Sequence, residues 1–190
     1  MPEEYVGVRY ISTCLGSMRD GVELYNIQNQ QRSIINLIQS IPHHYFQNNS
    51  GNVSYRIEST NYFVITGTAI NLQIIDNINE FAIVTSIQDE VVRYYGDILP
   101  SSETPLHGKI YLRFPDINWI VHTHPPINLL NQLSIPSSEK YLPYGTFEVG
   151  EMVTNLLNDN HSVVLKDHGL VSVGRTDNEV LRYLSSLLIF

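Results

Sequence analysis

Short β-prone runs alternate with helical segments along this chain, and that alternation is the strongest constraint on its fold. Apolar residues recur at helical spacing from residue 34 to 41 and stop at Pro42, which predicts one amphipathic helix lying on a sheet. Runs at residues 53–57, 62–65 and 81–87 are separated by Gly, Asn and Asp, as antiparallel strands would be. The pattern predicts a fold that mixes strands and helices throughout.

The second half of the chain continues in the same way. A helix is expected from about Glu103 to Phe114, with Ser101 or Ser102 as its N-cap and Pro105 in its first turn. The N-terminal residues 5–11 also have the composition of a strand. The other predicted elements are strands at residues 119–122, 163–165 and 171–173 and helices at 148–157 and 178–188.

Length and composition favour one compact domain. The chain has 190 residues, 43% of them hydrophobic, which is enough for a substantial core, and it contains no internal repeat or linker. Residues 28–190 are predicted to form the principal domain. Residues 1–27 form an N-terminal segment without an assigned role that is expected to pack on it.

Charge and cysteine content narrow the class of protein. A net charge of -8 without a cluster of Lys and Arg argues against a general nucleic-acid binder. No segment approaches the roughly 20 apolar residues that span a bilayer, so no membrane partner is expected. The single Cys14 excludes an intramolecular disulfide, and the N-terminus lacks a secretory pattern. The expected location is the cytoplasm.

The sequence His-Thr-His-Pro-Pro, which begins at His122, carries the strongest chemical signal. Side chains two residues apart in a strand share a face, so His122 and His124 are able to ligate one metal ion. His168 lies at a turn between two β-prone runs and is the candidate third ligand. The alternative is that these are ordinary polar residues at strand ends, hydrogen-bonded to the backbone.

A second cluster of polar residues precedes the helix expected at 103–114. Ser101, Ser102 and Glu103 place two hydroxyls and a carboxylate at a helix N-terminus, where anions are favoured. Glu103 is able to act as a general base near a metal. The alternative is a serine N-cap followed by an acidic first turn. His107 lies one helical turn from Glu103 and either supports that carboxylate or packs in the core.

Two turn segments are suited to close approach of a ligand to the backbone. One contains Gly51 and Asn52, and the other contains Thr66 and Gly67. Each segment taken alone is equally typical of a routine turn, since Gly and Asn favour turns for conformational reasons.

The order of these segments resembles the class II aldolase/adducin family, which includes L-fuculose-phosphate aldolase and L-ribulose-5-phosphate 4-epimerase. The resemblance covers about residues 30–188. It rests on five motifs in sequence: Gly51-Asn52-Val53-Ser54, Ile65-Thr66-Gly67-Thr68, Pro100-Ser101-Ser102-Glu103 with His107, Pro115-Asp116 before His122-Thr123-His124-Pro125, and Asp167-His168-Gly169-Leu170.

The resemblance implies a three-layer α/β/α fold with a mainly antiparallel sheet, assembled as a homotetramer with active sites between subunits. It implies zinc, or another divalent metal, bound by the three histidines with Glu103 as the general acid/base that also reaches the metal. The implied phosphate pocket consists of Gly51, Asn52, Thr66, Gly67, Ser101 and Ser102.

The activity implied by this resemblance is that of an aldolase, a lyase that cleaves a C–C bond of a small phosphorylated sugar or ketose through an enediolate. Epimerases of the family usually carry Asp where this chain has Glu103, which favours the aldolase. The segment after His124 lacks a clear counterpart of the tyrosine that the resemblance implies there, and Tyr141 is the candidate. Alternatives are an epimerase, decarboxylase or dehydratase on the same metal site, or a non-catalytic adducin-like interaction module.

Overall fold

The computed structural model describes residues 7–25, 27, 31–46, 49–158 and 160–188. Within these residues, eight strands form one sheet in the order β1-β5-β4-β3-β2-β6-β8-β7. The pairing of β1 with β5 is parallel, and the other strand pairings are antiparallel. The strands are β1 (Ile11–Gly16), β2 (Asn52–Arg56), β3 (Phe63–Thr66), β4 (Phe81–Gln88), β5 (Val91–Tyr95), β6 (Trp119–Thr123), β7 (Ser162–Leu165) and β8 (Gly169–Gly174).

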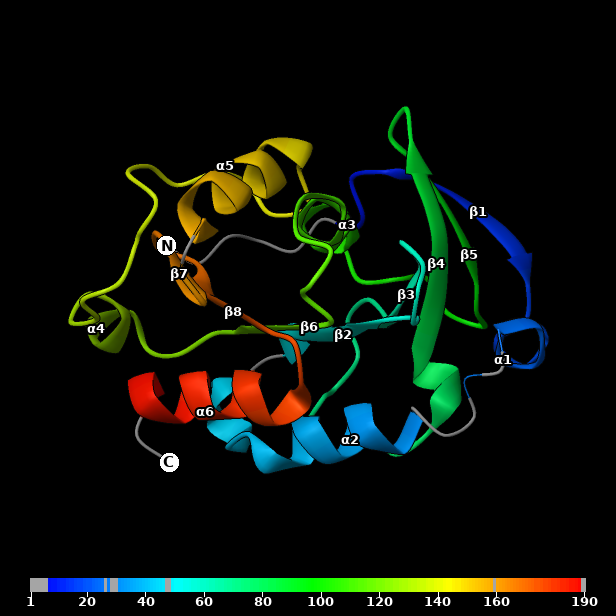
Figure 1. Ribbon diagram of the computed structural model, residues 1–190, viewed down its shortest axis with the longest axis horizontal. Helices are drawn as coiled ribbons and strands as arrows, with labels where there is room; N and C mark the ends of the chain where they lie inside the picture. The colour runs from blue at the N-terminus through cyan, green and yellow to red at the C-terminus, as the bar shows by residue number, and fades with distance from the viewer. Residues whose placement is uncertain (1–6, 26, 28–30, 47–48, 159, 189–190) are drawn as a thin grey trace.

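Helices cover both faces of this sheet, as Figure 1 shows, with α3 and α5 on one side and α2 and α6 on the other. The helices are α1 (Met18–Tyr25), α2 (Gln31–Ser40), α3 (Thr104–Arg113), α4 (Ile127–Leu130), α5 (Phe147–Leu157) and α6 (Asp177–Leu188). The fold is therefore the α/β/α arrangement with a mainly antiparallel sheet that the sequence resemblance implies.

Alternating residues of the central strands divide the core between the two faces. On β6, Ile120 packs in the cluster beneath α3 and α5, whereas Val121 packs in the cluster beneath α2 and α6. Such alternation follows from the two-residue period of a strand. His122 therefore faces the α3 side of the sheet, the side on which Ile120 lies.

The predicted elements agree with the structure within one to three residues, apart from the N-terminal strand. Residues 5 and 6 of that prediction lie outside the described residues, and residues 7–10 are not in a strand; β1 begins at Ile11 instead. Helices α1 and α4 and strand β5 were not predicted. Strand β1 pairs with β5, and α1 contacts β4 and β5. The division of the chain after residue 27 stays a prediction.

None of the described helices has the length and apolar character needed to cross a membrane.

Candidate metal centre

The end of β6 places two histidines over the α3 face of the sheet. His122 is the last-but-one residue of β6 and pairs with Asn52 of β2 on one side and Val171 of β8 on the other. His124 follows the strand, and its backbone N–H donates to the carbonyl of Tyr45 over 2.9 Å. The two Nε2 atoms lie 2.9 Å apart, so the predicted sharing of one face is observed.

The turn between β7 and β8 brings His168 to the same point. Its Nε2 lies 3.2 Å from Nε2 of His122, and its backbone N–H donates to the carbonyl of Leu165. Gly169 makes this approach feasible, since a Cβ there would lie 2.5 Å from the carbonyl oxygen of Thr123 and 2.7 Å from Cε1 of His122. Any larger residue would push the turn away from β6.

Glu103 completes the cluster from the other side. It is 4% exposed, and its Oε2 lies 3.1 Å from Nε2 of His122 while its Oε1 lies 3.5 Å from Nε2 of His168. One ligand atom from each of Glu103, His122, His124 and His168 lies within 4.8 Å of the others. The structure thus brings together all four residues predicted as metal ligands.

Glu103 also corrects the predicted start of α3. The sequence favoured Ser101 or Ser102 as the N-cap, but the N-cap residue is Glu103, and its side chain makes no capping hydrogen bond. The carboxylate turns toward the histidines instead. Ser101 has a different role: its backbone N–H donates to the Thr66 carbonyl, and its Oγ accepts from the backbone N–H of Glu103.

The protonation of the histidines suits a metal ion. Burial, followed by the charge of the neighbouring histidine, lowers the pKa of His122 and of His124 well below the ordinary value, so both imidazoles are neutral. Nδ1 of His122 lies 3.1 Å from the Leu170 carbonyl oxygen, which only accepts, so Nδ1 carries the proton and Nε2 is bare. A neutral imidazole with a bare nitrogen is the form that binds metals.

The donor set passes a geometric test for one small divalent ion. Tetrahedral zinc with ligands at about 2.0–2.1 Å requires neighbouring donor atoms about 3.3 Å apart. The distances from Nε2 of His122 to its neighbours are 2.9, 3.1 and 3.2 Å. Moreover, the buried Oε1 of Glu103 has no hydrogen-bond partner among the described residues. These three distances and the chemistry of the residues fit a bound metal, and the four donor atoms as a set lie within 4.8 Å of one another.

The six residues predicted to bind phosphate lie in three short segments: the start of β2, the end of β3 and the turn that precedes Glu103. Gly67 bridges to Pro100, which joins the loop of Thr66 to that of Ser101. Gly51 has a φ of 81°, and a Cβ there would lie 2.6 Å from the His122 carbonyl oxygen. Gly51 and Ser102 are partly exposed, whereas the other four residues are buried: Asn52, Thr66, Gly67 and Ser101. Their role as a phosphate pocket stays a prediction.

Sequence reasoning missed the residues that hold Glu103 from the side away from the histidines. Nδ2 of Asn52 donates to Oε2 of Glu103 over 2.7 Å, and His107 lies behind Asn52. His107 therefore supports Glu103 indirectly, through Asn52 of β2, and not by direct side-chain contact.

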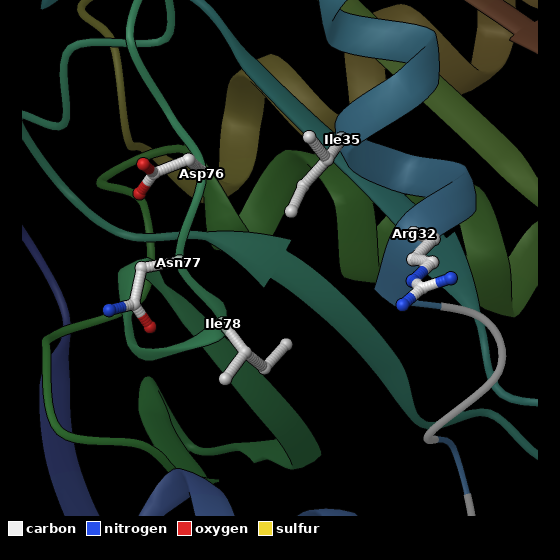
Figure 2. A pocket seen from close by; sticks show the side chains of 5 residues that line it. All are labelled: Arg32, Ile35, Asp76, Asn77 and Ile78. Carbon is white, nitrogen blue, oxygen red and sulfur yellow. The ribbon is translucent and has the colours of Figure 1, made fainter.

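Tyr141 is 38% exposed. A separate cavity of about 400 Å³ lies between α2 and the loop after β3, away from every predicted site residue (Figure 2); it is lined by Arg32, Ile35, Asp76, Asn77 and Ile78.

Comparison with known proteins agrees with this fold. The family described as "Class II Aldolase and Adducin N-terminal domain" matches residues 34–187. An L-fuculose phosphate aldolase from Methanococcus maripaludis is 30% identical over 152 residues, which cover 71% of this chain and 78% of the relative. A methylthioribulose-1-phosphate dehydratase from Stenotrophomonas maltophilia is 40% identical over 50 residues, 26% of this chain and 21% of the relative.

Among solved structures, a sugar-phosphate aldolase from Thermotoga maritima superposes with a TM-score of 0.72 at 20% identity. The match covers 85% of this chain and 91% of that one, which establishes a common fold. Together with the match to the family over residues 34–187, this shows that the chain belongs to the class II aldolase and adducin family.

Proposed function

We propose that this chain is a metal-dependent aldehyde-lyase that reversibly cleaves a C–C bond of a small sugar phosphate. The observation that carries the proposal is the buried carboxylate of Glu103, turned toward three histidines instead of capping its own helix. The similarity to L-fuculose phosphate aldolases supports the choice of a sugar phosphate as substrate. A purely structural module would not need a buried acid among three histidines.

Zinc is the proposed metal, held by His122, His124, His168 and Glu103. Three imidazoles and a carboxylate are ligands that zinc accepts readily. When bound, the metal would act as a Lewis acid that polarises the carbonyl and hydroxyl oxygens of the substrate. The remaining chemistry falls to the residues of the chain.

Glu103 is proposed to move the proton. In the cleavage direction, Glu103 would accept the proton of the hydroxyl beyond the breaking C–C bond, the aldehyde would depart, and the electron pair of the bond would remain as an enediolate. Glu103 then delivers a proton to the carbon that was cleaved, which completes the ketone product. In the synthetic direction, the Glu103 carboxylate removes that same proton. Its position 3.1 Å from His122 Nε2 places the base beside the proposed metal.

The three segments that contain the predicted phosphate-binding residues are proposed to bind the phosphate group of the substrate. Backbone N–H groups and hydroxyls in glycine-containing loops bind phosphate without requiring a basic residue. The proposed residues are Gly51, Asn52, Thr66, Gly67, Ser101 and Ser102. Such a local arrangement is compatible with the overall net charge of -8.

A dehydratase is the second candidate. It is favoured by the 40% identity over 50 residues to a methylthioribulose-1-phosphate dehydratase. That reaction also begins with removal of a proton next to a carbonyl, so the same base and metal would serve it. We further propose a cytoplasmic homotetramer with active sites between subunits, on the strength of the family resemblance.

Proton exchange on dihydroxyacetone phosphate in deuterium oxide tests the proposed reaction. The zinc-loaded protein should replace one carbon-bound proton by deuterium, because formation of the enediolate is half of the aldolase reaction. Proton NMR would follow the loss of that signal, and protein stripped with a chelator serves as the control. A protein that holds one zinc per chain yet exchanges no proton would contradict the aldolase proposal and favour the dehydratase.

A further inference from the structure

Five buried polar side chains form a line that leads from Glu103 into the core between β2 and α3. A helix advances about 6 Å over four residues, and a strand advances about 6.6 Å over two. Because these two distances are similar, polar residues at those spacings on a helix and on a facing strand are able to alternate along one line. α3 and its N-cap supply a residue at every fourth position, and β2 supplies a residue at every second position. The exposed fractions are Glu103 4%, His107 0% and Tyr111 1% from the helix, and Asn52 3% and Ser54 0% from the strand.

Hydrogen bonds connect these side chains alternately from helix to strand. Oη of Tyr111 lies 2.7 Å from Oγ of Ser54, which lies 2.6 Å from Nδ1 of His107. Nε2 of His107 lies 2.6 Å from Oδ1 of Asn52. Nδ2 of Asn52 then donates to Oε2 of Glu103 over 2.7 Å. The line thus ends on the carboxylate beside the three histidines.

The carboxylate at one end determines where each proton lies. A carboxylate only accepts hydrogen bonds, so Asn52 presents its NH₂ group to Glu103 and its carbonyl oxygen to His107. His107 must therefore carry a proton on Nε2. Burial outweighs the nearby charge of Glu103 and lowers the pKa of His107 to about 4, which keeps the ring neutral and Nδ1 bare.

A bare Nδ1 requires a donor, and the Ser54 hydroxyl is the group in contact with it. Since Ser54 uses its proton for His107, its oxygen accepts the hydroxyl proton of Tyr111 over 2.7 Å, a shorter contact than the 3.3 Å from Oη of Tyr111 to the Asn118 carbonyl oxygen. Every donor in the line then points toward Glu103. Aligned hydrogen bonds of this kind polarise and strengthen one another in a low-dielectric core.

We propose that His107 is a positioning residue that fixes the Asn52 amide and thereby holds the Glu103 carboxylate toward the three histidines. This inference rests on the proposed role of that carboxylate at the metal. Glu103 occupies the N-cap position of α3, where an acidic side chain ordinarily turns back to accept from the N–H groups of the first turn. The side-chain N–H of Asn52 competes with the N–H groups of the helix end for the Glu103 carboxylate. The hydrogen bond from His107 to Oδ1 of Asn52 prevents the amide from rotating.

Zinc affinity, measured by competition with a chelator, tests this positioning role without relying on activity. His107→Phe should weaken zinc binding by about 10–100-fold, the range seen when residues that orient metal ligands are lost. In a Glu103→Ala background the same change should weaken binding by less than about threefold, because the ligand on which His107 acts is absent. An equal loss in both backgrounds would overturn the proposal and assign His107 a role in folding alone.

A matched pair of serine variants separates positioning from general destabilisation. Both serines are buried residues of the same sheet, and each hydroxyl contacts one other hydroxyl. Oγ of Ser54 lies 2.7 Å from Oη of Tyr111, and Oγ of Ser162 lies 2.7 Å from Oγ of Ser172. Ser54→Ala and Ser162→Ala therefore remove equivalent groups. Both should lower the thermal unfolding temperature. Ser54→Ala alone should reduce zinc affinity, and a similar reduction in Ser162→Ala would contradict the proposal.

The tautomer of His107 provides a test that does not depend on the folding of any variant. Nitrogen NMR of the unaltered zinc-loaded protein should show His107 protonated at Nε2 and bare at Nδ1. The opposite tautomer would overturn the inference, since Asn52 would then have to turn its carbonyl oxygen toward Glu103. If these tests succeed while dihydroxyacetone phosphate shows no proton exchange, the proposed aldolase reaction fails and the positioning role stands.

Discussion

Glu103→Gln is expected to slow deuterium exchange on dihydroxyacetone phosphate by about 10²–10⁴-fold, the usual contribution of a positioned general base. The amide oxygen of glutamine still accepts the hydrogen bond from Asn52, so the side chain should keep its place while losing its capacity to take a proton. Exchange would be followed by proton NMR at saturating zinc, because the change also removes the charge of a proposed ligand.

Glu58→Gln provides the matched control for this variant. Glu58 lies on an exposed turn after β2, so the same chemical change there should leave exchange at the wild-type rate. Exchange by zinc-saturated Glu103→Gln within about threefold of the wild type would rule out Glu103 as the base. The proton would then have to move through another group.

The second large effect is expected on metal binding. His122→Asn should weaken zinc binding on the order of 10²-fold, because four ligands share about 10–16 kcal/mol and each contributes about 3 kcal/mol. Nε2 of His122 lies within 3.2 Å of His124, His168 and Glu103, so its loss removes the donor that contacts all three others. Zinc affinity would be measured by chelator competition on the purified variant.

Asparagine is chosen at position 122 because it separates metal binding from folding. Its amide N–H is able to replace Nδ1 of the histidine as donor to the Leu170 carbonyl, while nothing replaces Nε2. Unfolding of the chelator-treated protein should therefore change little, and the stabilisation that added zinc gives the wild type should disappear. A variant that retains wild-type zinc affinity would show that His122 is not a ligand.

Much of the fold follows from local patterns in the sequence. The apolar spacing from residue 34 to 41 predicted α2, and the prolines after His124 marked the end of β6. The i, i+2 spacing of His122 and His124 predicted correctly that the two side chains share a face. Strand β1 was misplaced because the composition of residues 5–11 resembles a strand, whereas the pairing with β5 begins only at Ile11.

The surroundings of Glu103 could not be predicted in the same way. The expected N-cap was a serine, because serine is a stronger local capping signal than glutamate, and tertiary contacts overrode that preference. The hydrogen bond from Asn52 to Glu103 joins residues 51 positions apart, which no local pattern reveals. The four-residue spacing of Glu103 and His107 placed these side chains one helical turn apart, but it did not indicate the strand that they meet.

The regular spacing of the polar residues on β2 and α3 brings their line of hydrogen bonds to the proposed metal centre. The face of β2 that carries Asn52 and Ser54 lies over α3, next to β6, which carries His122 (Figure 1). Buried polar groups stabilise a core only when each donor and acceptor among them has a hydrogen-bond partner. The line from Tyr111 meets that condition up to Glu103, where Oε1 lacks a hydrogen-bond partner among the described residues. That carboxylate oxygen is the one left for a metal or a substrate.

X-ray absorption at the zinc edge tests most directly whether Glu103, His122, His124 and His168 bind one metal ion. After zinc loading and removal of loosely bound ions, the protein should hold one zinc per chain. The spectrum should show four nitrogen or oxygen ligands at about 2.0–2.1 Å with the outer scattering of three imidazoles. A zinc ion with fewer than two imidazoles, or a folded protein that binds no zinc, would contradict the metal centre and the reaction proposed for it.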